Sequence, residues 1–586
     1  MNPRRITVWL IVVLSLVLGG CSRFPTSGPI ETVGDVSSDE RTAGIDVAAQ
    51  PPDPGAGAEA ILDGFLAASE SPADGYAVAR QYLTDQAAAA WRPEAGIDVY
   101  DASGQSRVIT ADGSAVVRAP LVGRLDEDHI FTAARDTEYS HNFELTRVDD
   151  QWRISNPGAG ILMSRQRFQQ AFQAVPVYFL NLPGDRLVPQ QVFLRQNEFS
   201  ATAPDALVRA VIRGPGSWLR PAVFNALPDG VTSSGTWVGD DGIAHLALSE
   251  QIEALSADQR LQAAAQLLFT LSHFGSIDGL QINVNNRSLA IRGADDNGIL
   301  RFSELSQYDP ERTRAPRDLY AIQDSAIIKL PETVGAAQIR LPGALGSGWD
   351  QDPAWLAVSW QGTEVAVVNA DRTGLYRAST GDGEPVATYE GTMLTKPQFD
   401  ADERLWTLDN TADGVVAVVA SGEDEPLVVP IPEFGSSRVL SFRISPDSAR
   451  MAVIVDTGQT QQLGMLRLRG SDQLVIDGWR ELPLNTASGQ LTSLRDVAFS
   501  SSGKMMVLGA GEGDSQFSVY SVDIDAAQVT SQGPLYGADV VAVTAMPLDG
   551  TVTAAVLTVT DLALRYEAQY RWQGLLDDVT DVAYPS

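Results

Sequence analysis

Ile444–Ala452 read ISPDSARMA, an apolar residue followed by a polar turn and a return to apolar residues at the eighth and ninth positions. Four further stretches of the 586-residue chain align with it without gaps: VSWQGTEVA from Val358, FDADERLWT from Phe399, FSSSGKMMV from Phe499 and MPLDGTVTA from Met546. Successive starts are 41, 45, 55 and 47 residues apart, and periods of this length fit one four-stranded sheet per repeat. Because a single such sheet cannot bury both faces, the pattern predicts a closed ring of stacked sheets, a β-propeller over residues 310–586.

The number of blades follows less directly from the pattern. ISPDSARMA resembles the turn between the two inner strands of a blade in TolB-type propellers. Five such turns are present, and a sixth blade could combine Asp318–Leu330 with Tyr566–Leu575 near the end of the chain. We therefore expect five or six blades.

Residues 172–292 alternate strand and helix signals. Ala203–Arg213 predicts a helix, Asp240–Gly242 a hairpin turn, and the spacing of Ser256 and Gln259 a capping box that opens a second helix. The order PDALVRAVIRGP, GTWVGDDGIAHLALS and GLQINVN resembles the GerMN domain, an α/β module of exported sporulation and germination proteins. That resemblance implies a binding or assembly role.

Residues 56–157 begin with helical spacing and continue as strands. Ile61, Leu62 and Phe65 share one helix face, and Thr84 or Asp85 can cap a later helix that ends at Trp91. A hairpin is expected around Asp149-Asp150. Helices followed by a curved antiparallel sheet resemble the α+β NTF2-like fold.

The start of the chain predicts export and lipidation. Arg4 and Arg5 precede the uncharged apolar run Ile6–Leu18, which is shorter than the roughly 20 residues that span a bilayer. Leu18, Gly19, Gly20 and Cys21 resemble a bacterial lipobox, which implies cleavage after residue 20 and S-diacylglycerol and N-acyl groups on Cys21. An ordinary signal with a chance cysteine is the alternative. Residues 21–55 are rich in Pro, Gly, Ser and acids, a composition typical of a flexible tether.

Composition excludes several function classes. Removing residues 1–20 takes away two arginines and no acid, which changes the formal charge from −32 to −34 and disfavours nucleic acid as a partner. No nucleophile elbow, phosphate loop or metal-ligand spacing is present, and the four histidines are scattered: His129, His141, His245 and His273. Paired acids lie mostly in turn sequences. We therefore expect a protein without catalytic residues, cofactor or metal.

The order of lipobox, tether, α+β domain, GerMN-like domain and propeller resembles the actinobacterial LpqB lipoprotein family. The resemblance implies anchoring on the outer face of the cytoplasmic membrane. It also implies binding to the extracytoplasmic part of a sensor histidine kinase of the MtrA–MtrB type, with an effect on cell division and envelope homeostasis. A scaffold that binds wall glycan or another envelope component is the alternative, and a hydrolase at the propeller mouth would need convergent acids. Four loop aromatics are candidate contacts or blade packing: Trp349, Tyr376, Tyr536 and Trp572.

Overall fold

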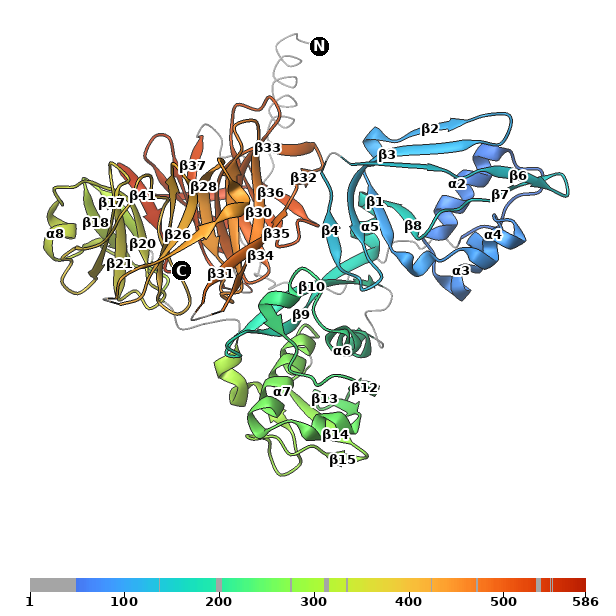
Figure 1. Cartoon of the computed structure of the whole chain (residues 1–586), viewed down its shortest axis with the longest axis horizontal. Coiled ribbons are helices and arrows are strands. Elements are labelled where there is room, and N and C mark those ends of the chain that lie inside the picture. Colours follow the sequence, from blue (N-terminus) through green and yellow to red (C-terminus); the bar gives the residue numbers. More distant parts are fainter. Residues whose placement is uncertain are drawn as a thin grey trace, which may run out of the picture. The chain divides into compact units, whose positions relative to one another are not determined.

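A computed structural model describes residues 49–586 apart from 136, 197–202, 275–276, 310–315, 334–335, 423, 471–472, 534–538, 549 and 551 (Figure 1). The predicted lipobox with Leu18, Gly19, Gly20 and Cys21 lies outside the described residues, as do residues 22–48 of the predicted tether and Tyr536. In the ranges that are described, no helix is both long and apolar enough to cross a bilayer.

The N-terminal region opens with helices α2 (Ala58–Ser69), α3 (Ala73–Arg80) and α4 (Asp85–Ala90). Ile61, Leu62 and Phe65 of α2 are buried, as their spacing predicts. The Thr84 hydroxyl accepts a hydrogen bond from the Ala87 N–H at 3.2 Å, which confirms the predicted cap of α4.

A sheet follows these helices. β1 runs parallel to β8, whereas β2, β4 and β5 all pair with the long strand β3. The sheet consists of β1 (Ile97–Tyr100), β2 (Ser106–Ile109), β3 (Ala115–Leu125), β4 (Phe131–Ala133), β5 (Glu138–Asn142) and β8 (Ile161–Ser164). Because β8 belongs to it, the sheet extends past residue 157 to Ser164. The α+β prediction is confirmed, and the NTF2-like assignment stays a prediction.

The hairpin predicted around Asp149-Asp150 is present as β6 (Leu145–Val148) and β7 (Gln151–Ile154). Asp149 and Asp150 have φ of 49° and 63°, the left-handed values that a tight two-residue hairpin turn needs and that Asp tolerates.

The middle region contains two sheets and two long helices. β9 (Phe172–Asn181) pairs with β10 (Leu187–Arg195) and β11 (Val223–Phe224). The second sheet has the order β12-β13-β14-β15, with β16 also on β14. The remaining elements are α5 (Arg165–Ala171), α6 (Ala203–Arg213), β12 (Ser233–Val238), β13 (Ile243–Leu248), α7 (Ala257–Leu271), β14 (Gly279–Val284), β15 (Arg287–Ser288) and β16 (Leu300–Arg301).

Helix α7 begins at the predicted capping box. The Ser256 hydroxyl accepts from the Gln259 N–H at 3.3 Å, and the Gln259 side chain accepts from the Ser256 N–H at 2.9 Å. α7 connects β13 to β14, and this crossover makes those two strands parallel.

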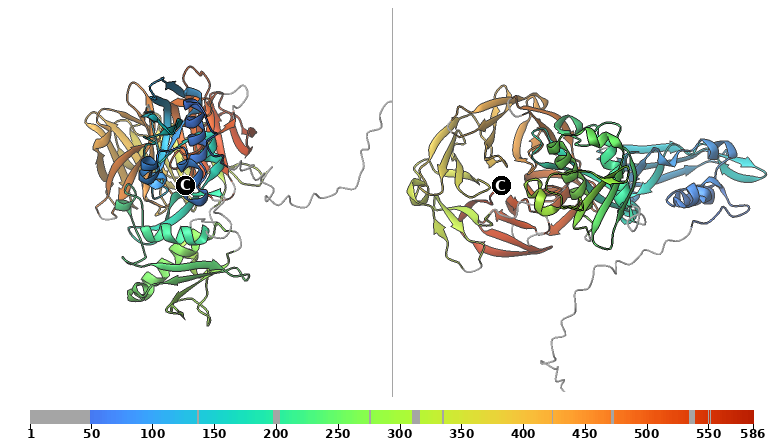
Figure 2. Two further views of the ribbon diagram at one scale, coloured as in Figure 1. Left: turned by 90° about the vertical axis from the view of Figure 1, so that its right-hand side faces the viewer. Right: turned by 90° about the horizontal axis from the view of Figure 1, so that it is seen from below.

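In the described part of the C-terminal region, the strands form six sheets of four or five strands. Figure 2 shows these sheets arranged around a central axis, with the C-terminus near it. The first sheet contains β17 (Leu319–Gln323), β18 (Ala326–Leu330), β19 (Ile339–Arg340) and β41 (Val579–Ala583), and the second, which follows helix α8 (Gly343–Ser347), contains β20 (Pro353–Val358), β21 (Glu364–Asn369), β22 (Gly374–Ser379) and β23 (Val386–Glu390). The third contains β24 (Gln398–Phe399), β25 (Leu405–Thr411), β26 (Gly414–Ala420) and β27 (Leu427–Ile431), and the fourth contains β28 (Arg438–Ile444), β29 (Arg450–Asp456), β30 (Gln461–Arg469) and β31 (Val475–Glu481). The fifth contains β32 (Asn485–Thr486), β33 (Gly489–Ser501), β34 (Lys504–Gly511), β35 (Ser518–Asp523) and β36 (Val529–Gly533), and the last contains β37 (Val540–Met546), β38 (Thr553–Thr558), β39 (Ala563–Ala568) and β40 (Arg571–Leu576).

The prediction for the sheet that contains Asp318–Leu330 was wrong about its partner. Val579–Ala583 (β41) pairs with β17, whereas Tyr566–Leu575 contributes to β39 and β40 of the last sheet. The physical reason is that β40 already completes its own four-stranded sheet, so the following strand is the one left to cross into the first sheet. The C-terminal strand thereby closes the ring.

Candidate functional site

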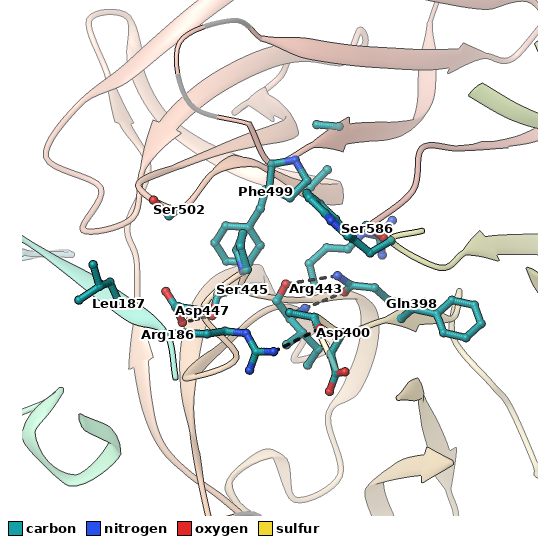
Figure 3. Close-up of a pocket in the computed structure, with 18 of the residues that line it drawn as sticks. Arg186, Leu187, Gln398, Asp400, Arg443, Ser445, Asp447, Phe499, Ser502 and Ser586 are labelled. Carbon is teal, nitrogen blue, oxygen red and sulfur yellow. Dashed lines mark hydrogen bonds between the residues drawn. The ribbon is translucent and has the colours of Figure 1, made fainter. Parts of the chain in front are cut away.

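The five repeated turns lie together at one end of the C-terminal region. Each turn connects two consecutive strands of its sheet, and residues from all five line one cavity of about 60 Å³ (Figure 3). They contribute Trp360, Asp400, Ser445, Asp447, Ser502 and Pro547, and the C-terminal residue Ser586 joins them. Residues from the second to the fourth position of the repeat therefore line one cavity at the mouth of the ring.

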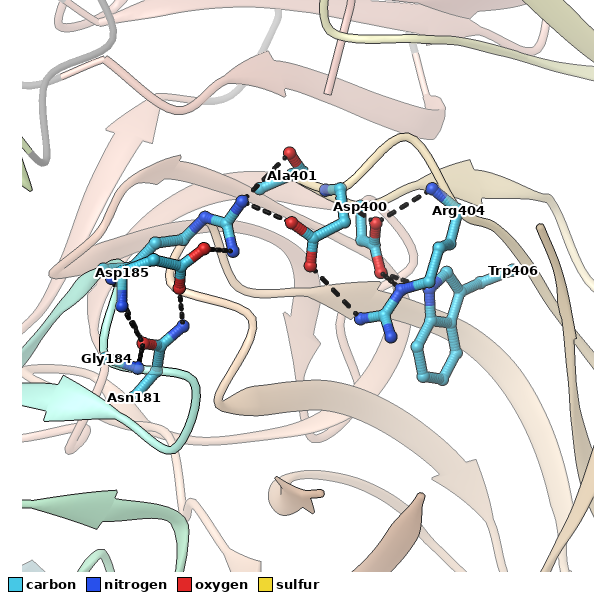
Figure 4. Close-up of polar contacts among 9 residues, drawn as sticks. Asn181, Gly184, Asp185, Asp400, Ala401, Arg404 and Trp406 are labelled. Carbon is cyan, nitrogen blue, oxygen red and sulfur yellow. Dashed lines mark hydrogen bonds and ion pairs between the residues drawn. The ribbon is translucent and has the colours of Figure 1, made fainter. Parts of the chain in front are cut away.

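The GerMN-like region closes this cavity with the turn between β9 and β10. Arg186, in that turn, forms an ion pair with Asp402 and donates to the Ala401 carbonyl at 3.3 Å (Figure 4). The Asn181 side-chain oxygen accepts from the N–H groups of Gly184, Asp185 and Arg186, each at 3.1 Å, which fixes the turn. The turn between β9 and β10 is therefore held in one conformation by its own hydrogen bonds, and it contacts the propeller through Arg186.

Asp400 is buried and fully hydrogen-bonded. It accepts from the N–H of Asp402 at 2.9 Å and of Arg404 at 3.0 Å, and from Arg404 Nε and Trp406 Nε1 at 2.7 Å each (Figure 4). A carboxylate with four donors has no lone pair left to act as a general base.

Asp447, in the turn of the next sheet, is also hydrogen-bonded by nearby groups of its own chain. It accepts from Ser445 Oγ at 2.6 Å and from the Ala449 N–H at 2.9 Å, and it pairs with Arg450. Arg450 in turn donates to the Pro189 carbonyl of β10 at 3.1 Å. The acids of the repeat turns therefore organise an interface between regions.

Two buried carboxylates, Asp496 and Asp581, connect different sheets of the propeller. Asp496 of β33 accepts from Ser441 Oγ at 2.6 Å and from the Val543 N–H at 2.9 Å, and it lies 3.7 Å from Arg443 Nη2. Asp581 of β41 accepts from Lys396 Nζ at 2.6 Å. Burial raises the pKa of Asp581, and Lys396 opposes that shift.

Sequence reasoning missed this second set of residues, although a signal exists. Asp496-Val497-Ala498-Phe499 and Asp581-Val582-Ala583-Tyr584 repeat an acid followed by two small apolar residues and an aromatic ring. An acid inside an apolar strand is costly unless it is paired, so its recurrence indicates a built contact.

A wider groove lies beside the cavity, between the GerMN-like region and the turn that begins β34. It has a volume of about 760 Å³ and is lined by residues of β9, β10 and α7 and by residues 501–504. His273 stacks on Tyr178 with ring centroids 6.2 Å apart, and burial lowers the pKa of His273. Lys504 at the rim pairs with Asp523 at 2.5 Å.

The sequence-predicted candidates fall at several places. Trp349 packs edge-on against Tyr376 with centroids 4.5 Å apart, and Trp572 packs against Tyr566 at 5.2 Å, so these rings contribute to packing of the sheets. Among the residues that the structure describes, no three His, Cys, Asp or Glu side chains are grouped so that they could hold a metal.

Three regions of this chain match family models. Residues 51–169 match the N-terminal domain of lipoprotein LpqB, residues 176–290 match the sporulation and spore germination (Germane) model, and residues 329–585 match the LpqB β-propeller domain. The chain is thus a three-domain protein with a GerMN domain and a C-terminal β-propeller. It belongs to the LpqB family of lipoproteins.

The relatives cover between about three quarters and all of the chain. Lipoprotein LpqB of Cutibacterium acnes is 29% identical over 97% of both chains, and that of Streptomyces coelicolor is 26% identical over 100% of this chain and 98% of its own. Lipoprotein LpqB of Mycolicibacterium smegmatis is 27% identical over 77% of this chain and 79% of its own.

Similar solved structures cover single regions. The structure of putative TolB from Agrobacterium tumefaciens is 12% identical to this chain with a TM-score of 0.33, over 46% of this chain and 98% of its own. The first GerMN domain of GerM from Bacillus subtilis is 20% identical with a TM-score of 0.18, over 22% of this chain and 92% of its own.

Proposed function

We propose that this lipoprotein is a non-catalytic accessory of a sensor histidine kinase of the MtrA–MtrB type, anchored on the outer face of the cytoplasmic membrane. In this role it binds the extracytoplasmic domain of the kinase and modulates signalling for cell division and envelope homeostasis. The family resemblance supplies the kinase as the partner. We also take each of the six sheets as one propeller blade.

A protein-binding role is supported chiefly by the outer edge of the third sheet. β27 pairs only with β26, so its other edge is free within the described sheet. Leu427 and Val428 are consecutive in β27, and they are 46% and 45% exposed. Pro430 is the one feature within β27 that discourages edge pairing, because the strand LVVPI carries no charge.

The outer strand of the next sheet differs from β27. β31 contains Asp477, Arg480 and Glu481, and all three are engaged by other parts of the chain. Asp477 pairs with Arg467 and Arg469, Arg480 donates to the Phe131 carbonyl at 3.0 Å, and Glu481 pairs with Arg135 at 2.5 Å. An exposed apolar edge that lacks charged side chains suits a partner that adds a strand or covers the edge. We therefore assign the kinase contact to the edge of β27.

The turn acids support the non-catalytic part of the proposal. Asp400 and Asp447 are held by donors of their own chain, and Asp496 and Asp581 hold sheets together. A hydrolase needs two carboxyl groups that differ in protonation and face a substrate, whereas these four acids are bonded to groups of their own chain.

Acylation at Cys21 completes the proposal. Two membrane-bound partners share one plane, which raises their effective concentration, so a modest contact would be well occupied. Acyl chains supply anchoring that a chain of formal charge −34 after removal of residues 1–20 cannot obtain from anionic lipid.

The test is calorimetric titration of residues 49–586 with the soluble extracytoplasmic domain of the kinase. Val428→Lys should weaken binding at least tenfold, because it places a charge at the edge of β27. The matched control is Val108→Lys, since Val108 is an exposed valine on the edge strand β2. Equal binding by wild type and Val428→Lys would overturn the assignment to β27.

A further inference from the structure

An exposed tryptophan lies on the GerMN sheet, remote in sequence from the propeller turns. Trp237 is on the edge strand β12 and is 53% exposed. Its indole stacks on the imidazole of His245, with ring centroids 5.2 Å apart and 15° between the planes. The stacking holds the indole in one orientation, so that it presents a flat apolar surface to a ligand.

The register extends this pair into a row across three strands. Trp237 lies opposite His245 on β13, and His245 lies opposite Gln281 on β14; Figure 1 shows the three strands side by side. The neighbouring residues Leu246, Leu280 and Ile282 are fully buried. Since strand side chains alternate between faces, the Trp237 row lies on the face opposite the helix-covered core.

Hydrogen bonds hold the row in place. Gln281 Nε2 donates to the Asn297 carbonyl at 2.7 Å, so its Oε1 is the atom that accepts from His245 Nδ1 at 2.8 Å. Asn283 Nδ2 also donates to this oxygen, at 3.2 Å. In the neutral imidazole, Nε2 then remains an acceptor.

The row contains no Asp, Glu, Lys or Arg side chain. Trp237, His245, Gln281 and Asn283 offer one flat ring together with imidazole and amide groups, and Ala247, opposite Asn283, adds little bulk. The nearby acids serve their own turns: Asp241 Oδ1 accepts from the Ile243 N–H at 3.2 Å, and Asp295 Oδ1 accepts from the N–H groups of Asn297 and Ile299 at 2.9 Å.

We propose that this face of the GerMN sheet, the Trp237 row, binds a neutral polysaccharide. The C–H face of a pyranose ring is apolar and flat and would stack on the indole, while imidazole and amide groups exchange hydrogen bonds with hydroxyl and acetamido groups. An anionic polymer would be repelled, because the acylated chain, without residues 1–20, carries a formal charge of −34. The proposal does not depend on the kinase partner.

The test uses the full acylated chain in detergent micelles and three neutral hexasaccharides: chitohexaose, cellohexaose and xylohexaose. Binding is measured by calorimetry at glycan concentrations up to the millimolar range, with anionic polygalacturonate as the charged comparison. Trp237→Ala removes the ring, and Trp237→Phe keeps a smaller one. Tyr570→Ala is the matched control, because Tyr570 is 61% exposed and lies in the propeller.

The proposal expects at least one neutral hexasaccharide to bind more tightly than polygalacturonate. Trp237→Ala should then lower the affinity about tenfold or more, which is about 1.4 kcal/mol, with Trp237→Phe in between and Tyr570→Ala within about twofold of wild type. Absence of binding by all three hexasaccharides would overturn it. So would preferential binding of polygalacturonate, or equal losses in Trp237→Ala and Tyr570→Ala.

Discussion

Lys396 Nζ lies 2.6 Å from Asp581 Oδ1, although 185 residues separate the two in the chain. The same ammonium donates to the Val582 carbonyl at 2.7 Å, and Asp581 Oδ2 accepts from the Leu356 N–H at 2.8 Å. The last strand of the protein is therefore tied to the second sheet and to the segment that leads into the third.

Removing either member of this pair should open the ring closure. Asp581→Ala leaves the Lys396 ammonium buried without its counter-ion, and losing one partner of a buried pair costs about 3–5 kcal/mol. Urea unfolding of residues 49–586 measures this loss. Arg571→Met is the control, because Arg571 pairs with Glu567 at 2.8 Å on the surface and its side chain is 70% exposed, so its loss should cost about 1 kcal/mol or less. Equal losses in the two variants would contradict the account.

Trp218 should couple the GerMN domain to the propeller. Its Nε1 donates to the Gly478 carbonyl at 2.7 Å, and the guanidinium groups of Arg467 and Arg480 lie 6.0 and 5.8 Å from its ring. Trp218→Ala should lower the free energy of unfolding by about 3 kcal/mol and split one calorimetric transition into two. Trp237→Ala should change neither quantity. A single unshifted transition in Trp218→Ala would show that the domains are not coupled through this side chain.

Stability should fall as the pH rises from about 4 to about 7, in part through Asp525. Burial, with the neighbouring Asp523, raises the pKa of Asp525 to about 7, against about 3.9 for an unperturbed aspartate. Between these values the folded state holds a proton that the unfolded state has released, so this contribution to stability is present below pH 4 and lost by pH 7. Asp525→Asn should flatten the dependence of the urea midpoint on pH. An unchanged slope in this variant would refute the assignment.

Cys21→Ala should abolish anchoring. Without the thiol that receives the lipid, we expect an uncleaved precursor or a released protein in fractionated cells, followed by immunoblot and by labelling with a palmitate analogue. Cys21→Ser tests the same point with a smaller change in shape, because a hydroxyl replaces the thiol. A processed and membrane-retained Cys21→Ala protein would contradict the lipobox prediction.

Local signals in the sequence were sufficient for several features of the fold. Thr84, the Ser256–Gln259 capping box and the Asp149-Asp150 turn act within a few residues, and the spacing of the five repeat turns is itself periodic. The partner of β17 was not predictable in this way. Both β40 and β41 are strands of ordinary composition, and only the completed last sheet decides which of them crosses to the first.

In the candidate site, too, some features could be predicted from the sequence and others could not. That the repeat turns would meet at one end follows from their equivalent positions. The pair between Arg186 and Asp402 could not be anticipated, because it joins two domains through side chains that resemble many other surface charges in the sequence. The acids of the two Asp-Val-Ala-aromatic motifs were detectable only by comparing strands 85 residues apart.

The central claim is tested most directly by titrating residues 49–586 with the extracytoplasmic domain of the sensor kinase, using calorimetry and, in parallel, residues 316–586 alone. The account predicts that both bind with similar affinity, because β27 belongs to the propeller, and that Val428→Lys weakens both. Absence of binding by residues 49–586, even at high micromolar concentration, would contradict the accessory role.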